Sequence, residues 1–251
     1  MGFDGKHRSL VIAYRLLPAA MLGGFLVPQG AIACRLALVL ALDVSSSVDV
    51  TEDRLQRDGL AAALRDPEVV AAFLSSPRPV ALHVFEWSGR YDQAHLIPDW
   101  RLIETADDIE AVAQSIETSP RSRSDMPTAI GYALGYASIL IADGPVCDFS
   151  TIDVAGDGVN NEGFGPTEAY AAFPFEGVTV NGLVINGADF EGEIDLIPYF
   201  QTQVIRGPGA FIEIANGYED YSRAMTRKLL AELSVQVIGF VGADVPIGPA
   251  G

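Results

Sequence analysis

Apolar residues along the chain alternate between short continuous runs and longer stretches with helical spacing. Residues 36–42, which read LALVLAL, form one such run and end at Asp43. A run of this kind is typical of a strand that is buried on both faces of a parallel sheet. A helical stretch begins at Thr51, and acidic residues occupy its first turn, where they interact favourably with the helix dipole. The pattern therefore opens with a strand followed by a helix.

The same alternation continues through most of the chain. Further strands are predicted at residues 80–87, 94–100, 146–154, 178–185 and 211–215, and helices at residues 107–117, 128–141, 166–173, 193–204 and 218–233. The polar turn before the third strand is short enough for a hairpin, so that strand is expected to be antiparallel and at an edge. This alternation predicts an α/β fold, doubly wound, with a mostly parallel six-stranded sheet and helices on both faces. Ligands of such folds bind at the carboxyl ends of the strands.

The first 33 residues have the organisation of a secretory signal peptide. Basic residues precede an apolar stretch at 16–27, and the small-residue motif Ala31-Ile32-Ala33 follows it. This order predicts cleavage after Ala33. A membrane anchor is the alternative, but an arginine and two prolines leave the uninterrupted part shorter than the roughly 20 residues that a span needs. No later stretch predicts a membrane span, so we expect a secreted or periplasmic protein.

Composition narrows the classes of function. Apolar residues make up 49% of the chain and charged residues 20%, as in a packed globular protein. The formal net charge is −17, and no basic run follows the first residues. Nucleic acid is therefore not an expected partner, because phosphate backbones are bound by clustered Lys and Arg. Three His and two Cys residues nearly exclude a zinc centre built from several such ligands.

The candidate chemistry follows the first predicted strand. Asp43, Ser45 and Ser47 are spaced by two residues, so in extended backbone their side chains point the same way. One carboxylate and two hydroxyls are the oxygen ligands that hard cations such as Mg²⁺ prefer. The alternative is that the serines only cap the next helix.

Asp-x-Ser-x-Ser at the end of a buried strand resembles the metal-ion-dependent adhesion site (MIDAS) of von Willebrand factor type A (VWA) domains. That family completes its site with a Thr ahead of the fourth helix and an Asp after the fourth strand, and Thr128 and Asp157 stand at the matching positions. Many members have Gly two residues before the Thr, whereas this chain has Met126. The stretches LALVLALDVSSSVD, FEWSG and VAGDGVNNEG also resemble a secreted bacterial VWA-like family of unassigned function.

The resemblance implies a function and a domain organisation. A signal peptide at 1–33 would precede a VWA-like domain at 34–236, and a Gly- and Pro-containing tail would follow at 237–251. The implied function is a divalent-cation-dependent adhesion or assembly module, in which a partner protein places an acidic side chain on the cation. The implied cation is Mg²⁺, with Mn²⁺ or Ca²⁺ possible, and the implied metal ligands are Asp43, Ser45, Ser47, Thr128 and Asp157.

The segment around Asp157 leaves other assignments open. Asp153 lies four residues earlier and competes as a ligand, but it falls within the predicted strand, which favours Asp157. An EF-hand loop beginning at Asp153 is excluded, because its twelfth position is Phe164 and not a bidentate Glu. The polar residues at 160–162 are interpreted either as a contact surface for a partner or as a solvated turn.

The resemblance also gives the two cysteines a role. The VWA strand order 3-2-1-4-5-6 would place Cys34 and Cys147 at the same end of neighbouring strands, far from the metal site. A disulfide there suits an oxidising compartment. Two buried free thiols are one alternative. A lipidated Cys34 is another, but Ala31 stands where a lipobox normally carries Leu, and the core strand begins at once.

Enzymes are the alternative class of function. A Mg²⁺-dependent phosphohydrolase would use Asp43 as its nucleophile, but the acid–base Asp expected two residues later is Ser45. No G-x-S-x-G nucleophile elbow or phosphate-binding glycine loop follows any strand. His83 and His95 are not linked by spacing to any serine. We therefore expect no enzyme, and a scaffold with a vestigial metal site is the remaining alternative.

Overall fold

The computed structural model describes residues 1–2, 34–123, 125–187 and 195–241. All helices and strands described belong to the unit Ile32–Gly251. The predicted signal peptide after its first two residues, and the last ten residues of the predicted tail, lie outside the described residues. Within the described part of the chain, no helix combines the length and apolarity that a membrane span requires.

The centre of the fold is a mostly parallel sheet with the strand order β3-β2-β1-β5-β6-β7, in which β4 also pairs with β2. Neighbours from β2 to β7 run parallel, while β3 and β4 run antiparallel to β2. The predicted doubly wound sheet with an antiparallel edge is therefore confirmed. The strands are β1 (Cys34–Asp43), β2 (Val80–Trp87), β3 (Gln93–His95), β4 (Arg101–Ile103), β5 (Cys147–Gly156), β6 (Val178–Ile185) and β7 (Ile212–Ala215).

The single strand predicted at 94–100 is wrong, because two short strands occupy that edge. The backbone N–H groups of Leu96 and Ile97 both donate to the carbonyl oxygen of Val84, at 3.0 and 3.5 Å, so the regular hydrogen bonding between this edge and β2 ends there. Pro98 follows and has no N–H to continue it. The described sheet consequently has seven strands rather than six.

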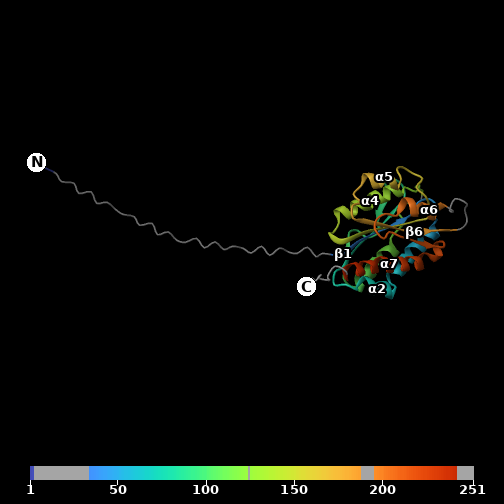
Figure 1. Cartoon of the computed structure of the whole chain (residues 1–251), viewed down its shortest axis with the longest axis horizontal. Coiled ribbons are helices and arrows are strands. Elements are labelled where there is room, and N and C mark those ends of the chain that lie inside the picture. The colour runs from blue at the N-terminus through green and yellow to red at the C-terminus, as the bar shows by residue number, and fades with distance from the viewer. Residues whose placement is uncertain (3–33, 124, 188–194, 242–251) are drawn as a thin grey trace, which may run out of the picture. The chain divides into compact units, whose positions relative to one another are not determined.

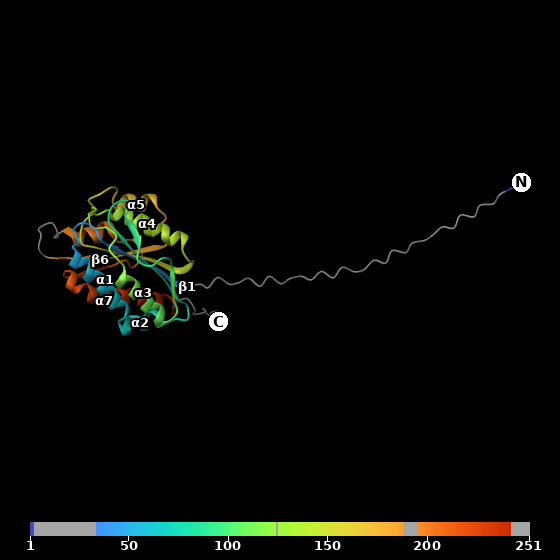
Figure 2. The same ribbon diagram turned by 180° about the vertical axis from the view of Figure 1, so that it is seen from behind.

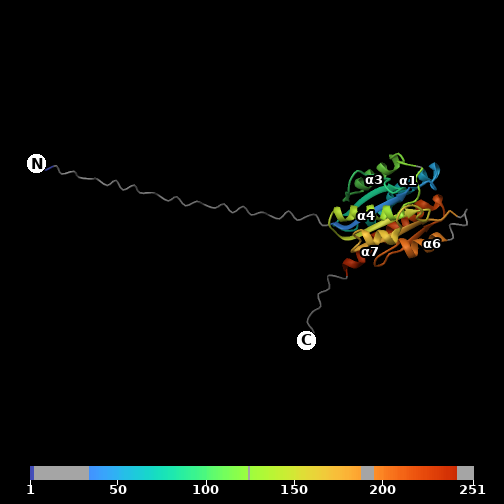
Figure 3. The ribbon, with the colours of Figure 1, turned by 90° about the horizontal axis from the view of Figure 1, so that it is seen from above.

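Helices cover both faces of the sheet. Figures 1 and 2 show α4 and α5 on one side and α2 and α7 on the other, and α1 and α3 lie side by side in Figure 3. The chain has one helix that the pattern did not predict, α2, and its last helix continues well beyond residue 233. The helical elements are α1 (Val50–Leu64), α2 (Pro67–Phe73), α3 (Ala106–Thr118), α4 (Ile130–Asp143), α5 (Pro166–Ala172), α6 (Leu196–Tyr199), η2 (Phe200–Val204), η3 (Tyr218–Asp220) and α7 (Tyr221–Val241).

Strand β1 is the centre of the core, and all ten of its residues are buried. Side chains of successive β1 residues point to opposite faces of the sheet, so they belong to two different apolar layers. Leu38 and Leu40 pack with α1, α2, α3 and α7, whereas Val39 and Ala41 pack with α4, α5 and α6. Burial on both faces explains why this strand has a continuous apolar sequence. The packing of β1 also fixes the position of Asp43, its last residue, at the carboxyl end of the strand.

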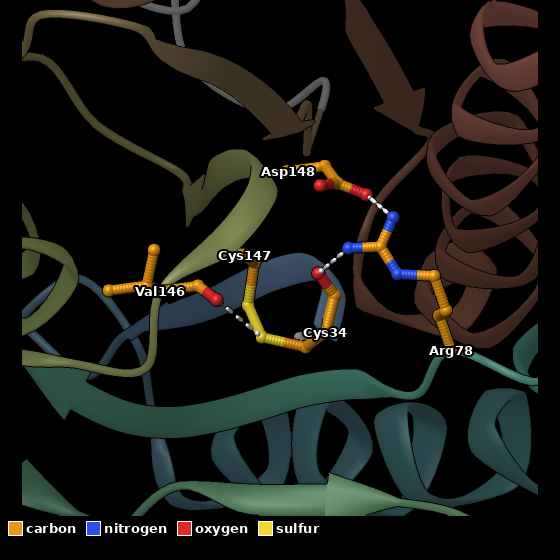
Figure 4. The surroundings of a disulfide bond; sticks show 5 residues. All are labelled: Cys34, Arg78, Val146, Cys147 and Asp148. Atoms are coloured by element: carbon orange, nitrogen blue, oxygen red, sulfur yellow. Dashed lines mark hydrogen bonds and ion pairs between the residues drawn. A yellow bond between two sulfur atoms is a disulfide. The ribbon is translucent and has the colours of Figure 1, made fainter. Parts of the chain in front are cut away.

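A disulfide bond links β1 and β5 at the end of the sheet opposite Asp43. Cys34 and Cys147 are register partners at the start of β1 and β5, and their sulfur atoms are bonded (Figure 4). Arg78 lies across this end, where it donates to the carbonyl oxygen of Cys34 at 3.2 Å and forms an ion pair with Asp148. The predicted disulfide is confirmed, and it excludes a lipid on the Cys34 sulfur.

Candidate metal centre

Five oxygen-bearing side chains meet at the carboxyl ends of β1 and β5. Thr128 Oγ1 donates to Ser45 Oγ at 3.2 Å, and Ser45 Oγ and Ser47 Oγ lie 3.1 Å apart. Ser47 Oγ then donates to Asp157 Oδ1 at 2.7 Å. Asp43 joins through its Oδ1 atom, which accepts the Ser45 backbone N–H at 2.8 Å. The structure therefore brings together every residue that the sequence indicated as a metal ligand.

Asp43 is one of two fully buried members of this cluster, together with Ser45. Its side chain has no exposed surface, and its Oδ2 atom is buried without a hydrogen-bond partner among the described residues. Burial, and then the charge of Asp157, raise the pKa of the Asp43 carboxyl to about 8. The ionised form of a buried carboxyl is unfavourable when one oxygen has no hydrogen-bond donor and a second carboxylate lies nearby. A bound cation would stabilise that ionised form.

The donor set fits a hard divalent cation. The described part of the chain has no group of three or more His, Cys, Asp or Glu side chains arranged to hold a metal ion. The cluster at Asp43 instead combines two carboxylates with three hydroxyls. Oxygen donors of this type suit Mg²⁺, Ca²⁺ and Mn²⁺ rather than soft metals.

The turn that carries the two serines is held from three sides. Gln56 of α1 donates to the carbonyl oxygen of Asp43 at 2.9 Å, and Arg121 donates to that of Ser45 at 3.0 Å. The Ser46 N–H donates to the carbonyl oxygen of Met126 at 2.8 Å. Met126, the departure from the VWA pattern, therefore still connects the Thr128 loop to the serine turn. Helix α1 then starts at Val50, with a capping box formed by Asp49 and Glu52.

Two asparagines of the polar loop after β5 bind the backbone at Thr128 and at the start of α4. Asn161 Oδ1 accepts the Thr128 N–H at 2.9 Å, and the Asn161 N–H donates to the Thr128 carbonyl oxygen at 2.9 Å. Asn160 Oδ1 accepts the Gly131 N–H at 3.2 Å, in the first turn of α4, whose N-cap residue Ala129 provides no side-chain cap. These asparagines are therefore bracing groups of the site, which neither interpretation of residues 160–162 had included.

A buried ion pair lies beneath the loop that leads to Thr128. Arg57 of α1 binds Glu86, which is near the end of β2, and both side chains are almost fully buried. Glu86 Oε1 accepts the Ser122 N–H at 2.6 Å, and Arg57 donates to Ser119 Oγ at 2.5 Å. The pair thus anchors the loop between α3 and α4 to the sheet.

Tyr218 is a member of the site that the sequence did not indicate. Its hydroxyl donates to Asp157 Oδ2 at 3.0 Å, from the short helix η3 that precedes α7. Burial, and then the charges of Asp157 and Asp43, raise the pKa of Tyr218 well above its ordinary value, so the phenol stays protonated and remains a donor. No local motif marks this residue, because it is separated from the other members along the chain.

Asp153, the competing ligand, lies outside the cluster. It is buried against α7, with Oδ1 2.9 Å from Lys228 Nζ. Glu232 also pairs with Lys228, at 2.7 Å. Burial is the largest cause that raises the pKa of Asp153, to about 7. Asp153 therefore connects the sheet to α7, while Asp157, directly after β5, contacts the serines.

His83 and His95 belong to a separate polar group at the edge of the sheet. His83 Nε2 and His95 Nδ1 are 2.8 Å apart, and the Tyr136 hydroxyl is 2.6 Å from His95 Nε2. Burial, and then the charge of His95, lower the pKa of His83 to about 4. Among the described contacts of these two histidines, none is with a serine.

Residues 33–237 match a family model described as a protein of unknown function, DUF1194. No curated protein matches the chain significantly in sequence. Among solved structures, proximal thread matrix protein 1 from the mussel byssus, with a zinc-occupied MIDAS motif, is 18% identical with a TM-score of 0.54, covering 80% of this chain and 48% of that one. The pilus adhesin SpaC from Lactobacillus rhamnosus GG is 14% identical with a TM-score of 0.57, covering 83% and 30%.

A von Willebrand factor type A protein from Catenulispora acidiphila is 15% identical with a TM-score of 0.51, covering 81% of this chain and 43% of that one. The chain thus spans less than half of the length of each of these relatives. At such identities the likeness concerns the fold, and it confirms the resemblance to VWA domains.

Proposed function

The chain belongs to the DUF1194 family of proteins of unknown function, and we propose that it is a divalent-cation-dependent protein-binding module of the VWA type. The observation that carries the proposal is the oxygen cluster at the carboxyl ends of β1 and β5. Asp43, Ser45, Ser47, Thr128 and Asp157 would hold the cation, preferably Mg²⁺, with Mn²⁺ or Ca²⁺ as substitutes.

The charge and burial of the cluster explain how it would bind a partner. Asp43 has an unpartnered buried oxygen that a cation would satisfy, while the hydroxyl ligands contribute no charge. Ser47 and the loop after Asp157 are accessible at the surface, so a partner could approach there. A cation held mainly by neutral oxygens remains electrophilic, and a carboxylate from another protein is the complementary ligand.

The relatives support a binding role and a location outside the cytoplasm. They include a byssus matrix protein, whose MIDAS motif holds zinc, and a pilus adhesin. Adhesins and matrix proteins act by binding rather than by catalysis, and they act at or beyond the cell surface. We extend both features to this chain as proposals, together with a signal peptide at 1–33 and a periplasmic or secreted destination.

Calorimetric titration of Mg²⁺, Mn²⁺ and Ca²⁺ into the chelator-stripped protein tests the proposal. Asp43→Asn keeps the shape of the side chain and removes its charge, so we expect it to abolish saturable binding. Asp66→Asn is the matched control, because it also removes one negative charge, but at the N-cap of α2, where Asn caps equally well. It should bind like the wild type. A folded wild type that binds no cation, or an Asp43→Asn variant that binds equally well, would overturn the proposal.

A further inference from the structure

We propose that Tyr218 is a positioning residue of the metal site, whose hydroxyl fixes the orientation of the Asp157 carboxylate for the cation. This inference rests on the proposed function and adds a side chain that lies outside the Asp-x-Ser-x-Ser, Thr and Asp positions of the motif. Tyr218 does not have to touch the cation, because it acts through Asp157.

The Asp157 carboxylate is held from both sides. Ser47 Oγ donates to Oδ1 at 2.7 Å, and the Tyr218 hydroxyl donates to Oδ2 at 3.0 Å. A carboxylate with a single donor can still rotate about its last bond, whereas donors on both oxygens leave one orientation. Each oxygen retains a free lone pair after accepting one hydrogen bond, so both can still face a cation or its bound water.

Tyr218 is itself held rigidly, which makes it suitable for this role. Its side chain is buried, and it follows Gly217, which has a φ of 76°, a conformation that favours glycine. The Gly217 N–H donates to the carbonyl oxygen of Asn186, directly after β6, at 3.1 Å. Asp220 accepts the Asn216 N–H at 3.1 Å and pairs with Arg223 of α7. The turn therefore sets the phenol in place independently of the metal site.

A group that hydrogen bonds to a metal ligand affects the affinity for the metal without contacting the metal itself. Losing such a partner typically weakens metal binding by about 10- to 100-fold, because the ligand must then be ordered when the metal binds. Removing the Tyr218 hydroxyl should have an effect of this size on the cation. The fold should be affected much less, because the ring would keep its buried contacts.

The chain provides a matched control for this experiment in Tyr221. It is also buried, three residues further on, and its hydroxyl has no hydrogen-bond partner among the described residues. Tyr218→Phe and Tyr221→Phe therefore each remove one buried phenol oxygen from the same segment. Only the first removes a contact to the proposed metal ligand.

Two measurements are made on both variants and on the wild type: the Kd for Mg²⁺ and Mn²⁺ by calorimetry, and the melting temperature in excess chelator. We expect Tyr218→Phe to raise the Kd by about 10- to 100-fold, and Tyr221→Phe to match the wild type. An unchanged Kd in Tyr218→Phe would overturn the inference, whatever its melting temperature, because a merely structural residue changes stability and not metal affinity.

The wild type and Asp43→Asn in the same series separate the two proposals. If the wild type binds no cation, the proposed function and this inference both fail. If the wild type binds, Asp43→Asn does not, and Tyr218→Phe binds as tightly as the wild type, only the inference about Tyr218 fails.

Discussion

At the scale of single residues, His83 makes stability depend on pH. It is buried within a strand and hydrogen bonded to His95, and its pKa is lowered to about 4 from an ordinary value of 6.5. Between these values the unfolded chain binds more protons than the folded one, so the free energy of unfolding falls as the pH falls through this window. The loss should approach about 3 kcal/mol between about pH 7 and about pH 4.

Urea denaturation of the wild type and His83→Gln at both ends of this window measures the effect. Carboxyls with raised pKa values, such as Asp43 and Asp153, change stability in the opposite direction, because the folded state then binds more protons. Their effect is common to both proteins, so the difference between the two pH dependences isolates His83. Parallel pH profiles would show that His83 does not titrate as stated.

Some residues of the site could be predicted from the sequence, and others could not. Asp43, Ser45 and Ser47 follow from the period of a strand, and Thr128 and Asp157 from the resemblance to VWA domains. Tyr218 could not be predicted, because its contact with Asp157 depends on where the chain returns after β7. The asparagines after β5 were noticed only as polar residues, since the bonds of Asn161 to Thr128 and of Asn160 to Gly131 require the fold. That the five ligands bind a cation stays a prediction.

At the scale of elements, a buried charge cluster attaches α7 to the sheet. Lys228 is fully buried and pairs with Asp153 of β5 and with Glu232, and Asn181 of β6 donates to Glu232 at 2.8 Å. Lys228→Met removes the ammonium group and leaves the carboxylates of Asp153 and Glu232 buried without a positively charged partner. We therefore expect it to lower the free energy of unfolding by about 3–5 kcal/mol.

Arg227→Met is the control for this substitution. Arg227 is the preceding residue of α7, and its ion pair with Glu213 is exposed to solvent. Exposed pairs contribute about 0–1 kcal/mol, so this variant should unfold close to the wild type. Equal urea midpoints for the two variants would show that the buried cluster does not hold α7.

The elements themselves were predictable where burial left a regular pattern. Strand β1 has a continuous apolar run at residues 36–42 because both of its faces are covered. At the edge the pattern was misleading, since β3 ends at His95, before Pro98 and the two N–H groups that share Val84 as acceptor, and pairing with β2 resumes only in β4 after residue 100. Helix α2 has seven residues, too short for a periodic signal, although Asp66 and Pro67 form a typical helix start.

At the scale of the whole molecule, the disulfide and the candidate metal site lie at opposite ends of β1. A ten-residue strand separates them, which corresponds to about 30 Å. The disulfide joins residues that are 113 positions apart in the sequence, and closing a loop of that length stabilises a protein by about 4–5 kcal/mol in the chain-entropy model. The double variant Cys34→Ser, Cys147→Ser should therefore melt at a lower temperature and still bind Mg²⁺ with the Kd of the wild type below its melting temperature. A changed Kd would show that the two ends are coupled.

The architecture as a whole was predictable because strands and helices alternate with short connections, and this order restricts the chain to few topologies. The strand order came from the resemblance to VWA domains, since spacing alone does not fix it. The proposed function depends on a still smaller part of the molecule, the cluster at the ends of β1 and β5.

The position of a bound cation tests the central claim most directly. Crystals of the chelator-stripped protein soaked in Mn²⁺ would be measured at a wavelength at which manganese scatters anomalously. The account predicts one strong anomalous peak among the side-chain oxygens of Asp43, Ser45, Ser47, Thr128 and Asp157, and none there in Asp43→Asn. A saturating soak that gives no peak at this cluster, or a peak only elsewhere, would contradict it.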